Sequence, residues 1–127
     1  MAKQLFQMLL LGAIALPAAA ATDLSVAGRG ATLEQAVSAP HASSYRLLIL
    51  GKELQRIKAS EAGEDVRAAL DYARRSGAVA FVCEKDLKTQ HLHPADLLPG
   101  VVSVDASDVW ENGAPSEADR TLRSICS

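Results

Sequence analysis

The sequence predicts an α/β domain with a mostly parallel sheet and helices on both of its faces, in three layers. Two apolar runs, at residues 45–50 and 78–83, are nearly continuous, which is typical of strands covered on both faces. Segments with helical periodicity separate the expected strands along the chain. Aromatic residues make up only 4% of the sequence, so aliphatic side chains must build most of the core.

The expected domain begins with a short strand and a short helix. Residues 22–27 alternate weakly between apolar and polar side chains, and Gly28 follows them directly. Thr32 and Gln35 have the spacing of a capping box, which predicts a helix over residues 33–38.

A buried strand and the longest helix follow. Residues 45–50 form the clearest strand, closed by Gly51. Residues 64–76 are expected to be helical, because four apolar residues recur at helical spacing on one face: Val66, Ala69, Leu70 and Ala73. Arginines occupy the last turn and Gly77 follows, as is typical of a helix C-terminus.

The second half of the domain contains five expected elements. They are a strand, a short helix or turn, a short helix, a strand and a terminal helix, over residues 78–83, 84–90, 95–98, 101–104 and 116–125. Ser116 and Asp119 are spaced to cap the terminal helix.

The first 21 residues have the parts of a secretory signal peptide. Lys3 supplies the positive charge, and the apolar run over residues 5–16 is too short to span a hydrocarbon core of about 30 Å. Small residues with an A-x-A pattern end the segment at Ala21. We therefore expect a signal peptide at residues 1–21, one domain at residues 22–127, and a periplasmic or secreted protein with no membrane segment after cleavage.

Charge and composition argue against nucleic acid as a partner. The chain carries 13 basic and 15 acidic side chains and has no basic stripe interleaved with aromatic residues.

The chain has two cysteines, Cys83 and Cys126. Cys83 ends an expected strand, and the carboxyl ends of strands line the ligand crevice of open α/β sheets. Lys85 and Lys88 favour its thiolate, the form that attacks sulfur, whereas neighbouring carboxylates oppose it. An accessible Cys83 would accept sulfane sulfur as a persulfide, whereas a buried one would be an inert apolar side chain.

Cys126 adds two further interpretations. An oxidising compartment favours a disulfide with Cys83, which would contribute about 4 kcal/mol in the chain-entropy model. The same pair would also suit a cycle in which Cys126 resolves an intermediate on Cys83.

Two further sets of polar residues are candidates for a functional site. His91 and His93 are spaced to share a metal with Asp96 or Cys83, but a solvated loop is the favoured interpretation, and no metal or organic cofactor is expected. His91 would alternatively donate or accept a proton near Cys83. The polar residues after Gly51 would either line the same crevice or begin a solvated helix, the favoured interpretation; they are Lys52, Glu53 and Arg56.

Residues 77–104, GAVAFVCEKDLKTQHLHPADLLPGVVSV, resemble the DsrE/DsrF-like family of small sulfur-handling proteins. The shared pattern is a strand ending in Cys83, then Leu87 and Lys88, then a D-L-L-P-G-V turn into the next strand. The resemblance implies a flavodoxin-like fold, often trimeric or hexameric, with a persulfide on Cys83 in some members. Relatives usually continue with a helix and an aromatic strand, so the different sequence after residue 104 indicates that the last strand is missing.

These observations lead to one functional hypothesis and two rivals. The first is a periplasmic protein of sulfur metabolism that accepts or transfers sulfane sulfur on Cys83, with a small sulfur compound or a carrier protein as donor. The second is a non-catalytic binding or assembly module with structural or idle cysteines. A thiol–disulfide exchanger is the weakest, because the chain has no C-x-x-C motif.

Overall fold

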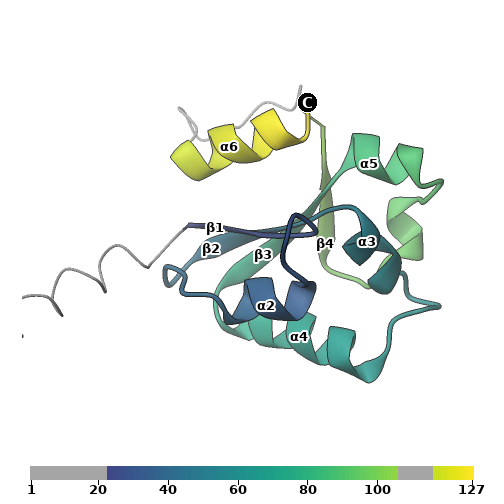
Figure 1. Ribbon diagram of the computed structural model, residues 1–127, viewed down its shortest axis with the longest axis horizontal. Helices are drawn as coiled ribbons and strands as arrows, with labels where there is room; N and C mark the ends of the chain where they lie inside the picture. Colours follow the sequence, from purple (N-terminus) through teal and green to yellow (C-terminus); the bar gives the residue numbers. More distant parts are fainter. Residues whose placement is uncertain (1–22, 106–115) are drawn as a thin grey trace, which may run out of the picture.

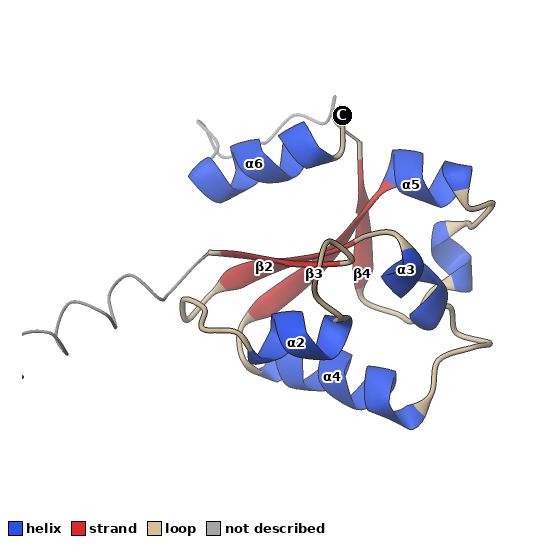
Figure 2. Cartoon of the chain, in the orientation of Figure 1, coloured by secondary structure: helices blue, strands red, loops and turns tan. Residues whose placement is uncertain are grey.

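The computed structural model describes residues 23–105 and 116–127. The expected signal peptide and the segment at residues 106–115 lie outside these ranges. Within them, four parallel strands form one sheet: β1 (Leu24–Ala27), β2 (Tyr45–Ile49), β3 (Ala78–Cys83) and β4 (Val101–Val104). The strands are hydrogen-bonded to one another in chain order, so all four predicted strands are confirmed. Figure 2 draws the strands of this sheet in red.

Helices cover both faces of this sheet, as Figure 1 shows. Helices α2 (Leu33–Ser38) and α4 (Glu64–Arg75) pack on one face, and α6 (Glu117–Ile125) lies across the other. Two further short helices, α3 (Lys52–Arg56) and α5 (Glu84–Thr89), follow the carboxyl ends of β2 and β3. The predicted α/β class with three layers is therefore confirmed, and the arrangement fits a small flavodoxin-like domain.

The alternation of faces along β2 explains why residues 47–49 are apolar without interruption. Leu47 and Ile49 are fully buried on the face of α2 and α4, whereas Leu48 is fully buried on the face of α6. Leu122 of α6 packs against Leu48 and is itself fully buried. A strand covered on both faces favours apolar side chains at consecutive positions, and this nearly continuous run is the pattern used for its prediction.

Both predicted capping boxes are present. Gln35 N donates to Thr32 Oγ1 over 3.1 Å, and Thr32 N donates to Gln35 Oε1 over 2.8 Å. At α6, Asp119 N donates to Ser116 Oγ and Ser116 N donates to Asp119 Oδ2, both over 3.1 Å. Each box satisfies two amide groups that have no partner within their helix.

The longest helix also agrees with its prediction. Val66, Leu70 and Ala73 of α4 are buried, and Ala69 is half-buried. The helix ends at Arg75, and Gly77 adopts a φ of +101°, a conformation that favours glycine.

One expected helix, over residues 95–98, is wrong in its extent. The structure has a three-residue 3₁₀ turn, η1 (Pro94–Asp96), after which the chain is extended. Leu97 bridges to Lys58, and Leu98 N donates to Ile57 O over 2.9 Å. Leu97 and Leu98 are both buried, so packing against the segment after α3 overrides the local helical preference.

Candidate functional site

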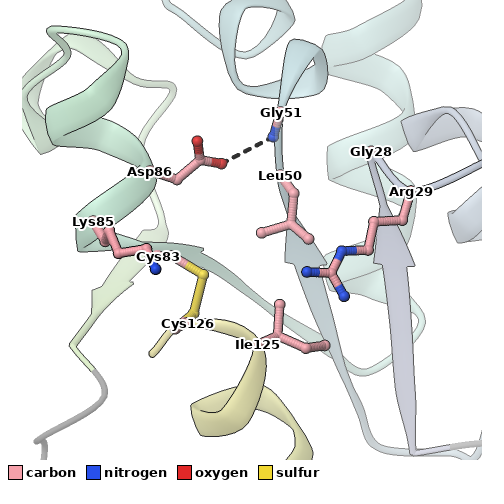
Figure 3. Close-up of a pocket in the computed structure, with 9 residues that line it drawn as sticks. All are labelled: Gly28, Arg29, Leu50, Gly51, Cys83, Lys85, Asp86, Ile125 and Cys126. Carbon is pink, nitrogen blue, oxygen red and sulfur yellow. Dashed lines mark hydrogen bonds between the residues drawn. A yellow bond between two sulfur atoms is a disulfide. The ribbon is translucent and has the colours of Figure 1, made fainter.

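A cavity of about 310 Å³ lies where the carboxyl ends of β1, β2 and β3 meet the C-terminal end of α6 (Figure 3). Parallel strands bring the loops that follow them to one edge of the sheet, so residues distant in sequence gather there. The cavity lining includes Arg29 after β1, Leu50 after β2, Cys83 and Lys85 around the end of β3, and Cys126.

Cys83 and Cys126 form a disulfide in the wall of this cavity. The Sγ atoms are 2.04 Å apart and the Cα atoms 5.1 Å apart, and the bond joins residues 43 positions apart in sequence. Each cysteine is only 3% exposed. Cys83 ends β3 and Cys126 follows the last residue of α6, so the bond ties this helix to the sheet. The sequence left open whether the two cysteines pair, and in the structure they form a disulfide.

A glycine turn after β1 brings Arg29 to the cavity. Gly28 has a φ of +104°, and its N–H donates to Ala31 O over 2.8 Å, which closes the turn. A Cβ at Gly28 would collide with the backbone oxygen of Leu50, so only glycine fits this close approach. Figure 3 shows the Arg29 side chain directed toward the side of the cavity where Leu50 and Ile125 lie.

Asp86 forms the opposite wall and is held by hydrogen bonds. Its Oδ2 accepts from Gly51 N over 2.9 Å, the contact drawn in Figure 3. Its Oδ1 accepts from Gln90 Nε2 over 3.0 Å, and the same amide donates to Gly51 O over 2.9 Å. These contacts join α5 to the end of β2 and satisfy both oxygens of the carboxylate.

Three residues were expected to support the Cys83 thiol, and they lie in different positions. Lys85 lines the cavity, and its Nζ donates to Ser127 O over 2.6 Å. Lys88 does not line the cavity and lies 3.2 Å from Glu84 on the exposed side of α5. His91 is exposed after that helix, with a φ of +58°, and is also not part of the lining. Of the three, the structure places only Lys85 beside the cysteines.

The polar residues after Gly51 do not line the cavity either. They form α3, the helix that the sequence favoured. Glu53 is buried, however, and its Oε1 accepts from Leu33 N over 2.8 Å and lies 2.7 Å from Arg56 Nη1. Arg56 also bonds Glu34, and this hydrogen bond holds the pKa of the Glu34 carboxyl below its usual value. The group therefore joins α2 to α3 rather than forming a binding site.

The other end of α6 is fixed by an ion pair. Arg46 Nε of β2 lies 2.6 Å from Asp119 Oδ1. Burial by itself raises the pKa of Asp119, but hydrogen bonds with Ser116 and the charge of Arg46 outweigh it and leave the pKa lowered. The ion pair and the disulfide thus hold α6 to the sheet at opposite ends of the helix.

The described residues contain neither a metal-binding cluster nor a membrane-spanning helix. No group of three or more His, Cys, Asp and Glu side chains in residues 23–105 and 116–127 is placed to hold a metal ion, including the segment around His91 and His93. Across the same ranges, no helix has the length and apolar character needed to cross a membrane.

Sequence reasoning missed Arg29. The available signal was the Gly28–Gly30 turn directly after the first strand, because this turn must emerge at the same sheet edge as Cys83.

Comparisons with protein-family models, with curated proteins and with solved structures each found no match to this chain.

Proposed function

We propose that this protein is an exported DsrE-like sulfur carrier that holds sulfane sulfur on Cys83 and uses Cys126 to resolve the intermediate. The observation that supports this proposal most is the meeting of Cys83 and Cys126 in the wall of a cavity at the carboxyl edge of the sheet. Sulfur exchange needs two thiols within bonding distance and an opening through which a donor can enter. We also propose that the protein works in the periplasm and that its sulfur donor is a small molecule or a carrier protein.

The cycle begins from the disulfide. A thiol reductant supplies two electrons and two protons, which opens the bond to two thiols. The Cys83 thiolate attacks the outer sulfur of a donor such as thiosulfate, the donor's S–S bond breaks, and sulfite leaves with the electron pair. Cys83 then carries a persulfide. Attack by the Cys126 thiolate on Cys83 Sγ releases hydrosulfide and restores the disulfide.

Intact mass measurement tests this assignment. The protein is reduced, freed of reductant and incubated with thiosulfate or polysulfide. We expect the wild type to gain one sulfur atom transiently, and Cys126→Ser to retain it, because no resolving thiol remains. Cys83→Ser should gain none.

Peptide mapping locates the sulfur. Tryptic cleavage after Arg75, Lys85 and Arg123 places Cys83 and Cys126 on separate peptides. Sulfur found only on the Cys126 peptide, or on neither peptide, would contradict the proposal.

A second candidate is a non-catalytic module whose disulfide is structural. The burial of both cysteines favours it, because a bond between two residues that are each 3% exposed is shielded from reductants. Titration of the folded protein with a thiol buffer separates the two candidates. A disulfide that opens only when the protein unfolds would support the structural module, whereas one that opens in the folded state would support the carrier.

The resemblance also leads us to propose a homo-oligomer, a trimer or a hexamer. Analytical ultracentrifugation of the mature protein tests this, and a monomer at micromolar concentration would contradict it.

A further inference from the structure

We infer that Arg29 is an anion-binding residue, and that the cavity binds a small sulfur oxyanion of the thiosulfate class. This inference rests on the proposed function for its choice of ligand. It concerns a residue that forms and breaks no covalent bond in the cysteine cycle.

The Arg29 side chain is available to a ligand. It is exposed at the cavity mouth, and its guanidinium has no hydrogen bond or ion pair with any described residue. Gly28 packs closely against the backbone of Leu50, so the fold sets the position of the next residue, Arg29, at the sheet edge. A guanidinium has five N–H donors in a planar fork that matches the oxygens of an oxyanion.

The other charged side chains of the lining already have partners. The Asp86 carboxylate accepts from Gly51 N and Gln90 Nε2, and Lys85 Nζ donates to Ser127 O. Arg29 is therefore the lining charge without a partner among residues 23–105 and 116–127. An anion entering the cavity would meet an unpaired positive charge.

The remainder of the lining suits a sulfur atom better than a second charged group. Leu50, Ile125 and the disulfide are apolar, and they lie in the same cavity as the guanidinium (Figure 3). Thiosulfate has an anionic sulfonate end and a polarisable outer sulfur. With its oxygens on Arg29, its outer sulfur would face the cysteines.

This placement has a chemical consequence for the transfer step. When the Cys83 thiolate bonds to the outer sulfur, the S–S bond of thiosulfate breaks and its electron pair departs with sulfite. Negative charge therefore accumulates on the group that Arg29 binds, and the guanidinium stabilises it.

Binding is tested first, on the oxidised protein, in which Cys83 has no free thiolate. We expect thiosulfate, titrated at low ionic strength and followed by NMR, to shift the amides of residues 28–30. Arg29→Gln should bind it about fivefold to tenfold more weakly, because a charge-assisted hydrogen-bond partner is lost. The matched control is Arg75→Gln, which removes an exposed arginine from α4 on the other face of the sheet and should bind like the wild type. Equal binding by Arg29→Gln and wild type, or no binding by the wild type, would overturn the inference.

Reaction rates are compared next, on the reduced protein, with thiosulfate and with the uncharged probe dimethyl trisulfide. When the Cys83 thiolate attacks a terminal sulfur of this probe, a methyl mixed disulfide forms and methyl persulfide leaves with the electron pair. Arg29→Gln should slow persulfide formation from thiosulfate about tenfold and leave mixed-disulfide formation from the trisulfide unchanged. A loss of both reactions in Arg29→Gln would overturn the anion role. Failure of wild-type Cys83 to gain sulfur from thiosulfate or polysulfide would overturn the proposed function, and the binding experiment alone would then decide whether Arg29 binds anions.

Discussion

Opening the Cys83–Cys126 disulfide should cost the domain about 4 kcal/mol of its free energy of unfolding. The bond joins residues separated by 43 positions, and the chain-entropy model assigns about this value to a loop of that length, because the cross-link restricts the unfolded chain. Most small domains are stable by only about 5–15 kcal/mol, so the loss is a large fraction of the total.

The same free energy appears in the redox equilibrium. If the disulfide stabilises the fold by about 4 kcal/mol, folding must stabilise the disulfide against the dithiol by the same amount. For a two-electron couple this lowers the reduction potential of the pair by about 85 mV relative to the unfolded chain.

Urea unfolding of the mature protein, with and without a phosphine reductant, measures the difference. The double variant Cys83→Ser/Cys126→Ser is the matched control, because it lacks the cross-link in both buffers and should unfold like the reduced protein. With an m-value of about 1–2 kcal/mol/M, the midpoint should fall by about 2–4 M on reduction. A decrease in free energy of less than about 1 kcal/mol would refute the entropic argument for this bond.

Three further predictions concern stability. Gly28→Ala should cost about 1–3 kcal/mol by thermal unfolding, since its φ is positive and the new Cβ meets Leu50, whereas Gly63→Ala, in open space with a negative φ, should cost less than about 1 kcal/mol. Leu122→Ala should lower the free energy of unfolding by about 2–5 kcal/mol, because this side chain of α6 is fully buried. The lowered pKa of Asp119 means that the folded state binds this proton less tightly than the unfolded state. Its contribution is therefore present above about pH 4 and lost as pH falls further, and a stability profile of Asp119→Asn should lack this loss.

Much of the fold was predictable because its signals are local. A capping box depends on two residues three positions apart, so Thr32 with Gln35 and Ser116 with Asp119 could be assigned without knowing any contact. The buried strands were equally clear from their apolar runs. The helix expected over residues 95–98 was wrong because Leu98 hydrogen-bonds with Ile57, a partner that no local pattern indicates.

The cavity was harder to predict because its parts come from separate segments. Cys83 could be placed at a sheet edge, since it ends a strand. The turn after the first strand places Arg29 at the same edge, but the sequence does not give the order of the strands, so it does not show how near Arg29 lies to Cys83. Glu53 was expected to be solvated, whereas it is buried beside Arg56, since burial depends on the position of α2 above it.

The two candidate functions differ in what they require of α6. A structural disulfide needs only to persist, and no other contact is then required to keep the helix attached. A sulfur carrier must pass through a dithiol state in which α6 still keeps Cys126 near Cys83. In that state the Arg46–Asp119 ion pair and the packing of Leu122 must hold the helix without the covalent bond. The burial of Leu122, worth about 2–5 kcal/mol, is comparable in size to the cross-link. A cysteine-free variant that keeps the α6 amides protected from hydrogen exchange would therefore satisfy the requirement for the cycle, and one that releases α6 would leave the disulfide its structural role.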